Sequence, residues 1–186
     1  ESYNTPMGVV KTIRGSLKAT DAIFVCEMGA KWVGDIKELC DIVHPHHGII
    51  TSIGPQHLES FKTLDAIKGT KFELADALPE GGMLFLNGDD ENIASYKGDR
   101  ANISYSLENG DYSAYDISVS ERGTTFTVKA PDGETQEFST KLIGSHNVQN
   151  IVGAIAMANS LGVSFDELVL PVKRLECVPH RLQIIK

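Results

Sequence analysis

Apolar runs alternate along the first half of the chain with segments in which apolar residues recur every three or four positions. The runs predict buried strands at residues 22–27, 48–53 and 83–87. The helical spacing predicts a helix at 34–43, with Ile36, Leu39, Cys40 and Val43 on one face, and another at 64–78. Thr5 followed by Pro6 is typical of a further helix start. This order favours an α/β fold in which helices flank a mostly parallel sheet.

The second half of the chain has a different pattern. Residues 102–140 alternate apolar and polar positions between turn sequences at Arg122-Gly123 and Pro131-Asp132-Gly133, which predicts a small antiparallel β subsheet packed beside the main one. Gly144 and Ser145 then open a long amphipathic helix, and a shorter helix is predicted near 165–173. We expect residues 1–178 to form one domain and residues 179–186 to begin a linker.

Composition narrows the class of protein. With 41% hydrophobic and 23% charged residues among 186, the chain is typical of a globular protein with a substantial core. No apolar stretch approaches the roughly 20 residues of a membrane span, and a net charge of −8 without a basic stripe argues against nucleic acid as a partner. No basic segment precedes an apolar leader, and the three cysteines lie in apolar surroundings. We therefore expect a cytoplasmic monomer with reduced thiols.

Candidate chemistry lies where two predicted strands end. Glu27 closes the first strand, and His57 follows the Gly54-Pro55 turn after the second. Carboxyl ends of parallel strands meet at one edge of a sheet, where ligands bind, so we expect these two side chains to share a site. Taken singly, Glu27, His57 and Lys71 are each compatible with ordinary surface side chains. The spacing of His44, His46 and His47 does not fit a closed zinc site.

Five motifs together carry a resemblance to a known family. They are Ser2-Tyr3-Asn4-Thr5-Pro6-Met7-Gly8, Glu27-Met28-Gly29-Ala30, Thr51-Ser52-Ile53-Gly54-Pro55-Gln56-His57-Leu58-Glu59, Lys71-Phe72-Glu73 and Gly144-Ser145-His146-Asn147-Val148-Gln149-Asn150. In this order they resemble the central, ATP-binding domain of the Mur ligases, over essentially the whole chain. Each motif is weak alone, and their joint occurrence carries the resemblance.

The resemblance implies an ATP-dependent amide ligase of peptidoglycan synthesis. Its substrates would be UDP-N-acetylmuramoyl-tripeptide and D-alanyl-D-alanine, joined through an acyl phosphate. Glu27 resembles the ligand of one Mg²⁺ and His57 that of a second. Lys71 resembles the lysine that becomes carbamylated in this family, which turns its cation into an anion that can face a metal. That modification requires the neutral amine and therefore a lowered lysine pKa.

Further site residues follow from the same resemblance. Asn147 and Asn150 resemble asparagines that contact adenine, and His146 their neighbouring histidine. Asn4 and Thr5 resemble a loop that contacts the muramyl substrate, and Arg181 would approach the nucleotide. From the residues alone, Asn147 could equally cap its helix.

The chain departs from the family in one respect. No Gly-x-x-x-x-Gly-Lys-Ser/Thr phosphate loop occurs in its 186 residues. We therefore expect a central domain truncated at its N-terminus, whose partners include N- and C-terminal domains of the same protein. Such a fragment should be inactive alone.

Three alternatives stay open. A related amide ligase, such as a folylpolyglutamate synthetase, would share the metal chemistry. A non-catalytic module that binds a nucleotide or a partner would explain the missing phosphate loop. A metal-dependent hydrolase could use Glu27, His57 and Glu59, but it would leave Asn147 and Asn150 without a role.

Overall fold

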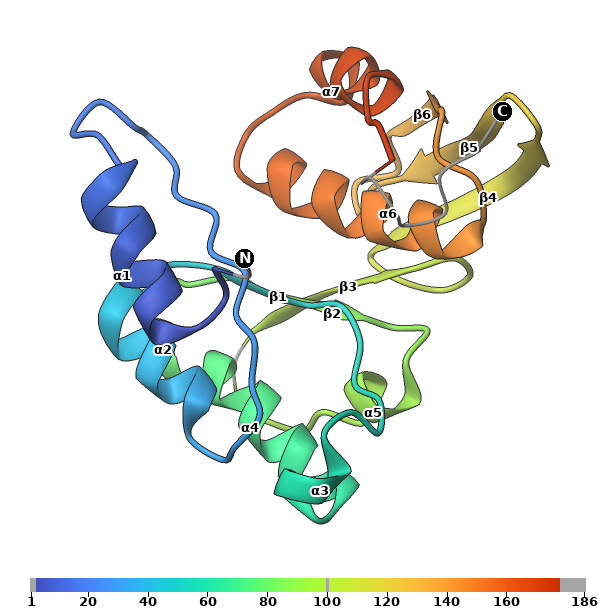
Figure 1. Ribbon diagram of the computed structural model, residues 1–186. Coiled ribbons are helices and arrows are strands. Elements are labelled where there is room, and N and C mark those ends of the chain that lie inside the picture. Colours follow the sequence, from blue (N-terminus) through green and yellow to red (C-terminus); the bar gives the residue numbers. More distant parts are fainter. Residues whose placement is uncertain (1–2, 100, 178–186) are drawn as a thin grey trace. The chain divides into compact units, whose positions relative to one another are not determined.

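The computed structural model describes residues 3–99 and 101–177 and contains one mixed β-sheet with flanking helices (Figure 1). Six strands follow one another in the order β1 to β6. Strands β3 and β4 pair in parallel, whereas β4 with β5 and β5 with β6 pair antiparallel. The strands are β1 (Gly48–Ile50), β2 (Leu84–Asn87), β3 (Asn102–Ser106), β4 (Tyr112–Ser120), β5 (Gly123–Lys129) and β6 (Thr135–Thr140). The helices are α1 (Pro6–Gly15), α2 (Asp35–Val43), α3 (Leu58–Phe61), α4 (Leu64–Ala77), α5 (Glu91–Ala94), α6 (Ser145–Ser160) and α7 (Phe165–Lys173).

The chain divides into two compact units, of which the first comprises residues 1–84 and 96–101. Helix α1 begins at Pro6, and the Thr5 hydroxyl accepts the Gly8 amide at 3.4 Å, as the sequence predicted. Helix α2 packs on both α1 and α4. Its apolar stripe forms a core cluster with α1, whose buried members are Val9, Ile36, Leu39 and Cys40. Each Leu or Ile buried there contributes about 1.5–3 kcal/mol to the free energy of folding.

The second unit comprises residues 85–95 and 102–186. Its antiparallel strands turn at the predicted places, since Ser120 pairs with Gly123 and Lys129 pairs with Thr135. Helix α6 packs on β3, β4 and β5, and α7 packs on β6 (Figure 1). The predicted alternation of the strands buries one row of aromatic rings, in which Phe138 stacks on Phe126 and meets Phe165 edge to face.

Three sequence predictions are corrected by this architecture. Residues 22–27 form no strand, and Ile23 and Val25 are 72% and 88% exposed; a strand needs a hydrogen-bonded neighbour, and within the described residues none pairs with this segment. The antiparallel strands β4–β6 continue the six-stranded sheet instead of packing beside it. The strand predicted at 48–53 is shorter in the structure and ends at Ile50. Across the described residues, no helix has the length and apolar character to cross a membrane.

Candidate active site

The loop before α2 brings Glu27 against the segment that precedes α1. Asn4 Nδ2 donates to Glu27 Oε1 at 3.4 Å, and the Gly29 amide donates to the Asn4 carbonyl at 3.0 Å. A Cβ on Gly29 would lie 2.9 Å from Asn4 Nδ2, which explains the glycine in this motif. The structure therefore joins two of the predicted site residues, Asn4 and Glu27, although they are 23 positions apart. Glu27 itself is exposed and can accept further ligands.

A hollow adjoins this contact within the first unit. It has a volume of about 370 Å³ and includes Asn4 and Glu27 in its wall. The remaining wall residues are Tyr3, Val9, Thr12, Phe24, Val25 and Cys26. Burial, reinforced by the charge of Glu27, raises the pKa of the Cys26 thiol. Cys26 is therefore a poor nucleophile at neutral pH, and the reactive polar group of this hollow is the carboxylate.

Lys71 is the second charged group of the first unit's candidate site. It lies half-buried on α4. Burial lowers the pKa of its ammonium group, and the nearby charge of Glu27 partly opposes that shift. A lysine with a lowered pKa has a larger neutral fraction, and the neutral amine is the form that reacts with carbon dioxide.

His57 occupies a strained position at the start of α3. The chain leaves β1 and turns tightly, with the Gln56 amide donating to the Gly54 carbonyl at 2.7 Å. His57 follows with a left-handed φ of 55°, and its carbonyl accepts the amides of Ser60 and Phe61. Left-handed backbone in a residue other than glycine is costly and concentrates at functional positions. Its imidazole is exposed, so it is available to a ligand.

The second unit contains the residues predicted to contact the nucleotide, His146, Asn147 and Asn150, in the first turns of α6. Gly144 is the N-cap and has a φ of 104°, so the cap contains no side chain. Asn147 donates from Nδ2 to the Ile143 carbonyl at 2.9 Å and does not cap the helix, which leaves its Oδ1 as an acceptor. His146 and Asn150 are exposed. Arg181 lies outside the described residues, and Thr5 serves as the cap of α1.

Two carboxylates outside the predicted site residues, Asp89 and Glu73, accept several hydrogen bonds within these units. In the second unit, Asp89 accepts hydrogen bonds from Ser106 Oγ, the Leu107 amide and Gln149 Nε2 at 2.7–2.8 Å. In the first unit, Glu73 accepts two backbone amides at the start of α2. The available signals were the Asn87-Gly88-Asp89-Asp90 turn after β2 and the position of Glu73 inside the Lys71 motif.

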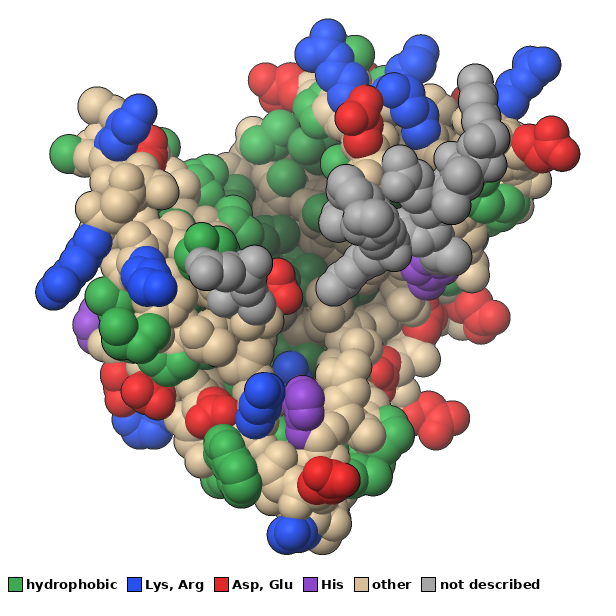
Figure 2. Space-filling model, in the orientation of Figure 1, with side chains coloured by type: hydrophobic (Ala, Val, Ile, Leu, Met, Phe, Trp, Pro, Cys, Tyr) green, Lys and Arg blue, Asp and Glu red, His purple; other side chains and the backbone are tan. Residues whose placement is uncertain are grey.

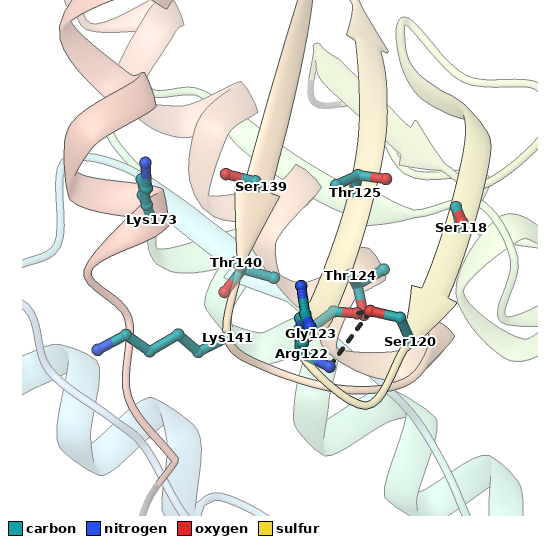
Figure 3. A pocket seen from close by; sticks show the side chains of 10 residues that line it. All are labelled: Ser118, Ser120, Arg122, Gly123, Thr124, Thr125, Ser139, Thr140, Lys141 and Lys173. Carbon is teal, nitrogen blue, oxygen red and sulfur yellow. Dashed lines mark hydrogen bonds between the residues drawn. The ribbon is translucent and has the colours of Figure 1, made fainter.

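A hollow of about 230 Å³ in the second unit contains none of the predicted site residues (Figure 3). Its wall carries the hydroxyls of Ser118, Thr125 and Ser139, which the register places in a row across β4, β5 and β6. Arg122, Lys141 and Lys173 are its cations, and Lys141 pairs with Glu176 at 3.5 Å. Figure 2 shows Lys and Arg side chains gathered over this part of the molecule. Hydroxyls on an exposed sheet face are usual, so this hollow is not our candidate.

The donor set of the first unit suits magnesium better than zinc. Within residues 3–99 and 101–177, no group of three or more His, Cys, Asp or Glu side chains could hold a metal ion. Mg²⁺ needs fewer protein ligands, because it is usually held by one or two carboxylates together with waters and substrate phosphates. Glu27 supplies one carboxylate, and Lys71 would supply a second if carbamylated. His47, one of the three clustered histidines, instead accepts the Met83 amide through Nδ1 at 3.1 Å.

Comparison with known proteins identifies the family. The model of the Mur ligase middle domain matches residues 1–158, and the chain belongs to this family. A similar curated relative is the UDP-N-acetylmuramoyl-tripeptide--D-alanyl-D-alanine ligase of Bacillus subtilis (strain 168), which is 29% identical over 185 residues, covering 100% of this chain and 40% of the relative. The chain thus spans about 40% of the length of that relative.

Solved structures of MurF proteins have the same fold. A crystal structure of MurF from Acinetobacter baumannii has a TM-score of 0.88 at 27% identity, covering 100% of this chain and 41% of that one. MurF ligase from Thermotoga maritima in complex with ADP has a TM-score of 0.83 at 25% identity, covering 96% and 42%. These likenesses agree with the mixed sheet and flanking helices described above.

Proposed function

We propose that the chain is the central domain of an ATP-dependent ligase that joins D-alanyl-D-alanine to UDP-N-acetylmuramoyl-tripeptide. The observation that carries the proposal is the hydrogen bond from Asn4 to Glu27 beside the hollow of about 370 Å³. Lys71, a half-buried lysine whose pKa is lowered by burial, supports it. Family membership supports the reaction class, and the similar D-alanyl-D-alanine ligases support the substrates. The ADP bound to the Thermotoga maritima relative supports ATP as the nucleotide.

In the proposed reaction, a carboxylate oxygen of the muramyl peptide attacks the γ-phosphorus of ATP, and ADP leaves. The amine of the dipeptide then attacks the acyl carbon, loses a proton and expels phosphate, which leaves a new amide bond. Bound Mg²⁺ would neutralise charge on the transferring phosphoryl group. Glu27 and a carbamylated Lys71 would hold one ion, and His57 would face a second. Asn4 would orient the Glu27 carboxylate through their hydrogen bond.

Nucleotide recognition is proposed for the start of α6. Asn147 keeps its carbonyl oxygen available, and Asn150 has an exposed carboxamide. A carboxamide can both donate to and accept from the edge of adenine. We place His146 beside them and Arg181 on the approach to the phosphates. Residues 1–178 would form the domain and 179–186 the start of its connection to a further domain of the same protein.

The test is ADP release by the full-length protein with UDP-N-acetylmuramoyl-tripeptide, ATP and Mg²⁺, with and without D-alanyl-D-alanine. We expect release that depends on the dipeptide and is lost in Lys71→Ala and in His57→Ala. Lys11→Ala, which removes an exposed cation from α1, is the matched control and should retain activity.

Other outcomes would assign a different function. Turnover with another amine only would retain the ligase and change its substrate. ATP hydrolysis without any amine would favour the hydrolase. No use of ATP under any of these conditions would contradict the enzymatic proposal and favour a binding module.

A further inference from the structure

Glu73 forms a polar contact between two helices of the first unit with both of its carboxylate oxygens. Its Oε1 accepts the Gly34 amide and its Oε2 accepts the Lys37 amide, both at 2.9 Å. The two oxygens of one carboxylate on α4 thus satisfy two backbone donors at the start of α2. These are charge-assisted bonds, and a negative charge at a helix N-terminus is also favoured by the helix dipole.

The first turn of α2 depends on this distant carboxylate because its own N-cap cannot serve. Gly34 is the N-cap, has a φ of 94° and offers no side-chain acceptor. The first amides of a helix have no partner within the helix. Glu73, 39 positions further along the chain, replaces the missing cap.

The same contact ties the end of the segment that carries Glu27 to the helix that carries Lys71. Between Glu27 and α2 the chain is held at three points. The Gly29 amide bonds to Asn4, and the amides of Lys31 and Trp32 bond to Asp35 at 2.8 and 2.9 Å. Glu73 holds the third point. Of the three residues that supply these acceptors, Asn4, Asp35 and Glu73, it alone lies on α4, the helix that carries Lys71.

Burial at the helix interface reinforces this connection. Met28 is the residue after Glu27. Its sulfur atom lies 3.9 Å from the sulfur of Cys40, which is buried in the core cluster of α2. A shift of α2 relative to α4 would therefore move Met28 and with it Glu27. The Glu27 carboxylate would then change its distance from the Lys71 amine.

We propose that Glu73 is a positioning residue that sets the Glu27-bearing segment against Lys71 and thereby tunes the affinity of this pair for a divalent cation. The proposal rests on the function proposed above, because it takes Glu27 and the carbamate that Lys71 would form with carbon dioxide to be the metal-binding pair. Glu73 itself does not contact the metal or the substrates. It acts through the backbone of residues 27–34.

Divalent-cation binding by the full-length protein in the presence of ATP tests this role, with Mn²⁺ as the probe and its free concentration read by electron paramagnetic resonance. The variant is Glu73→Gln, which keeps the side-chain size but places an NH₂ group against a backbone N–H. We expect Mn²⁺ affinity to fall about tenfold, the effect typical of losing a group that orients a metal ligand. The Mg²⁺ concentration for half-maximal ADP release should rise by a similar factor.

Glu167→Gln is the matched control. Glu167 also accepts a backbone amide at a helix start, that of Ser164 at 3.0 Å, but at α7 in the second unit. Both variants lose a helix-capping carboxylate, so both should lower the melting temperature, and only Glu73→Gln should change Mn²⁺ affinity. Unchanged Mn²⁺ affinity in Glu73→Gln, or an equal loss in Glu167→Gln, would overturn the positioning role.

The two proposals fail in different ways. If the wild-type protein releases no ADP but Glu73→Gln still weakens Mn²⁺ binding relative to Glu167→Gln, the ligase proposal falls and the positioning role stands. If the wild-type ligase is active and Glu73→Gln matches it in Mn²⁺ affinity and Mg²⁺ dependence, the reverse holds. Absence of Mn²⁺ binding by the wild-type protein with ATP would overturn both.

Discussion

At the scale of single residues, Gly29 constrains the contact between Asn4 and Glu27. A Cβ there would lie 2.9 Å from Asn4 Nδ2 and 3.0 Å from its Cγ, at the end of a side chain that can rotate away. We therefore expect Gly29→Ala to cost less than about 1 kcal/mol of stability, as a change relieved by one side chain does. Ligase activity should nevertheless fall about tenfold, because the Glu27 carboxylate loses the group that orients it.

Paired measurements of kcat and melting temperature on the full-length protein check this expectation. Gly15→Ala is the control, because a Cβ on Gly15 meets nothing within 4 Å; it should leave kcat near its wild-type value and should not lower the melting temperature. Full activity in Gly29→Ala would show that the Asn4 contact does not matter for catalysis.

The half-buried ammonium group of Lys71 should lower the stability of the folded protein when no metal or carbon dioxide is supplied. Its pKa in the folded protein lies below the ordinary 10.5 because of burial. Between the two values the unfolded chain binds more protons than the folded one, so stability should rise with pH in that window. Below the folded pKa, the full cost of burying the ammonium group is present.

Lys71→Met should therefore raise the melting temperature at pH 7 and should do so less at pH 10, because the lowered pKa makes a larger share of the wild-type amine neutral at the higher pH. A gain of 1 kcal/mol corresponds to about 2–4 °C for a protein of this size. Thermal denaturation at both pH values, with Lys11→Met as an exposed control, provides the measurement. A Lys71→Met protein that is less stable than wild type at pH 7 would contradict the buried charge.

At the scale of elements, helices were predicted more accurately than strands. The stripes of α2 and α4 appear in the sequence because a helix satisfies its backbone internally, so its pattern is local. Residues 22–27 have an apolar run as strong as that of β2, yet they lack the neighbour that makes a strand. The Glu73 contact was invisible for the same reason, since it joins residues 39 positions apart. Glu27, His57 and Lys71 were proposed as site residues from motifs, and their roles stay a prediction.

Helix α4 can be stabilised at Gly69 without disturbing its packing. Gly69 lies inside the helix, and a Cβ there meets nothing within 4 Å. Alanine loses less backbone entropy on folding, so Gly69→Ala should stabilise the protein by about 0.5–1 kcal/mol. Urea denaturation measures this change in the free energy of unfolding. Gly133→Ala is the opposite case for comparison, because Gly133 has a φ of 92° and alanine there should destabilise the hairpin. A loss of stability in Gly69→Ala would show that the helix surface at Gly69 is not open.

At the scale of the whole molecule, the proposed chemistry divides between the two compact units. Glu27, His57 and Lys71 belong to the first unit, and Asn147 and Asn150 belong to the second. The first set carries the groups proposed to act on the phosphates, and the second carries the carboxamides proposed to recognise adenine. Substitutions in the two units should therefore have different kinetic effects.

Asn150→Ala is the sharpest test of this division, because Asn150 is exposed and its substitution leaves the packing of α6 intact. Losing one or two hydrogen bonds to adenine should raise KM for ATP about tenfold while kcat changes little, since the same bonds exist in the ground and transition states. Lys71→Ala should instead abolish kcat. Gln136→Ala, which removes a carboxamide from β6, should alter neither. Steady-state ADP release at varied ATP concentration distinguishes these outcomes. A fall in kcat at unchanged KM in Asn150→Ala would assign that residue to phosphoryl transfer instead of nucleotide recognition.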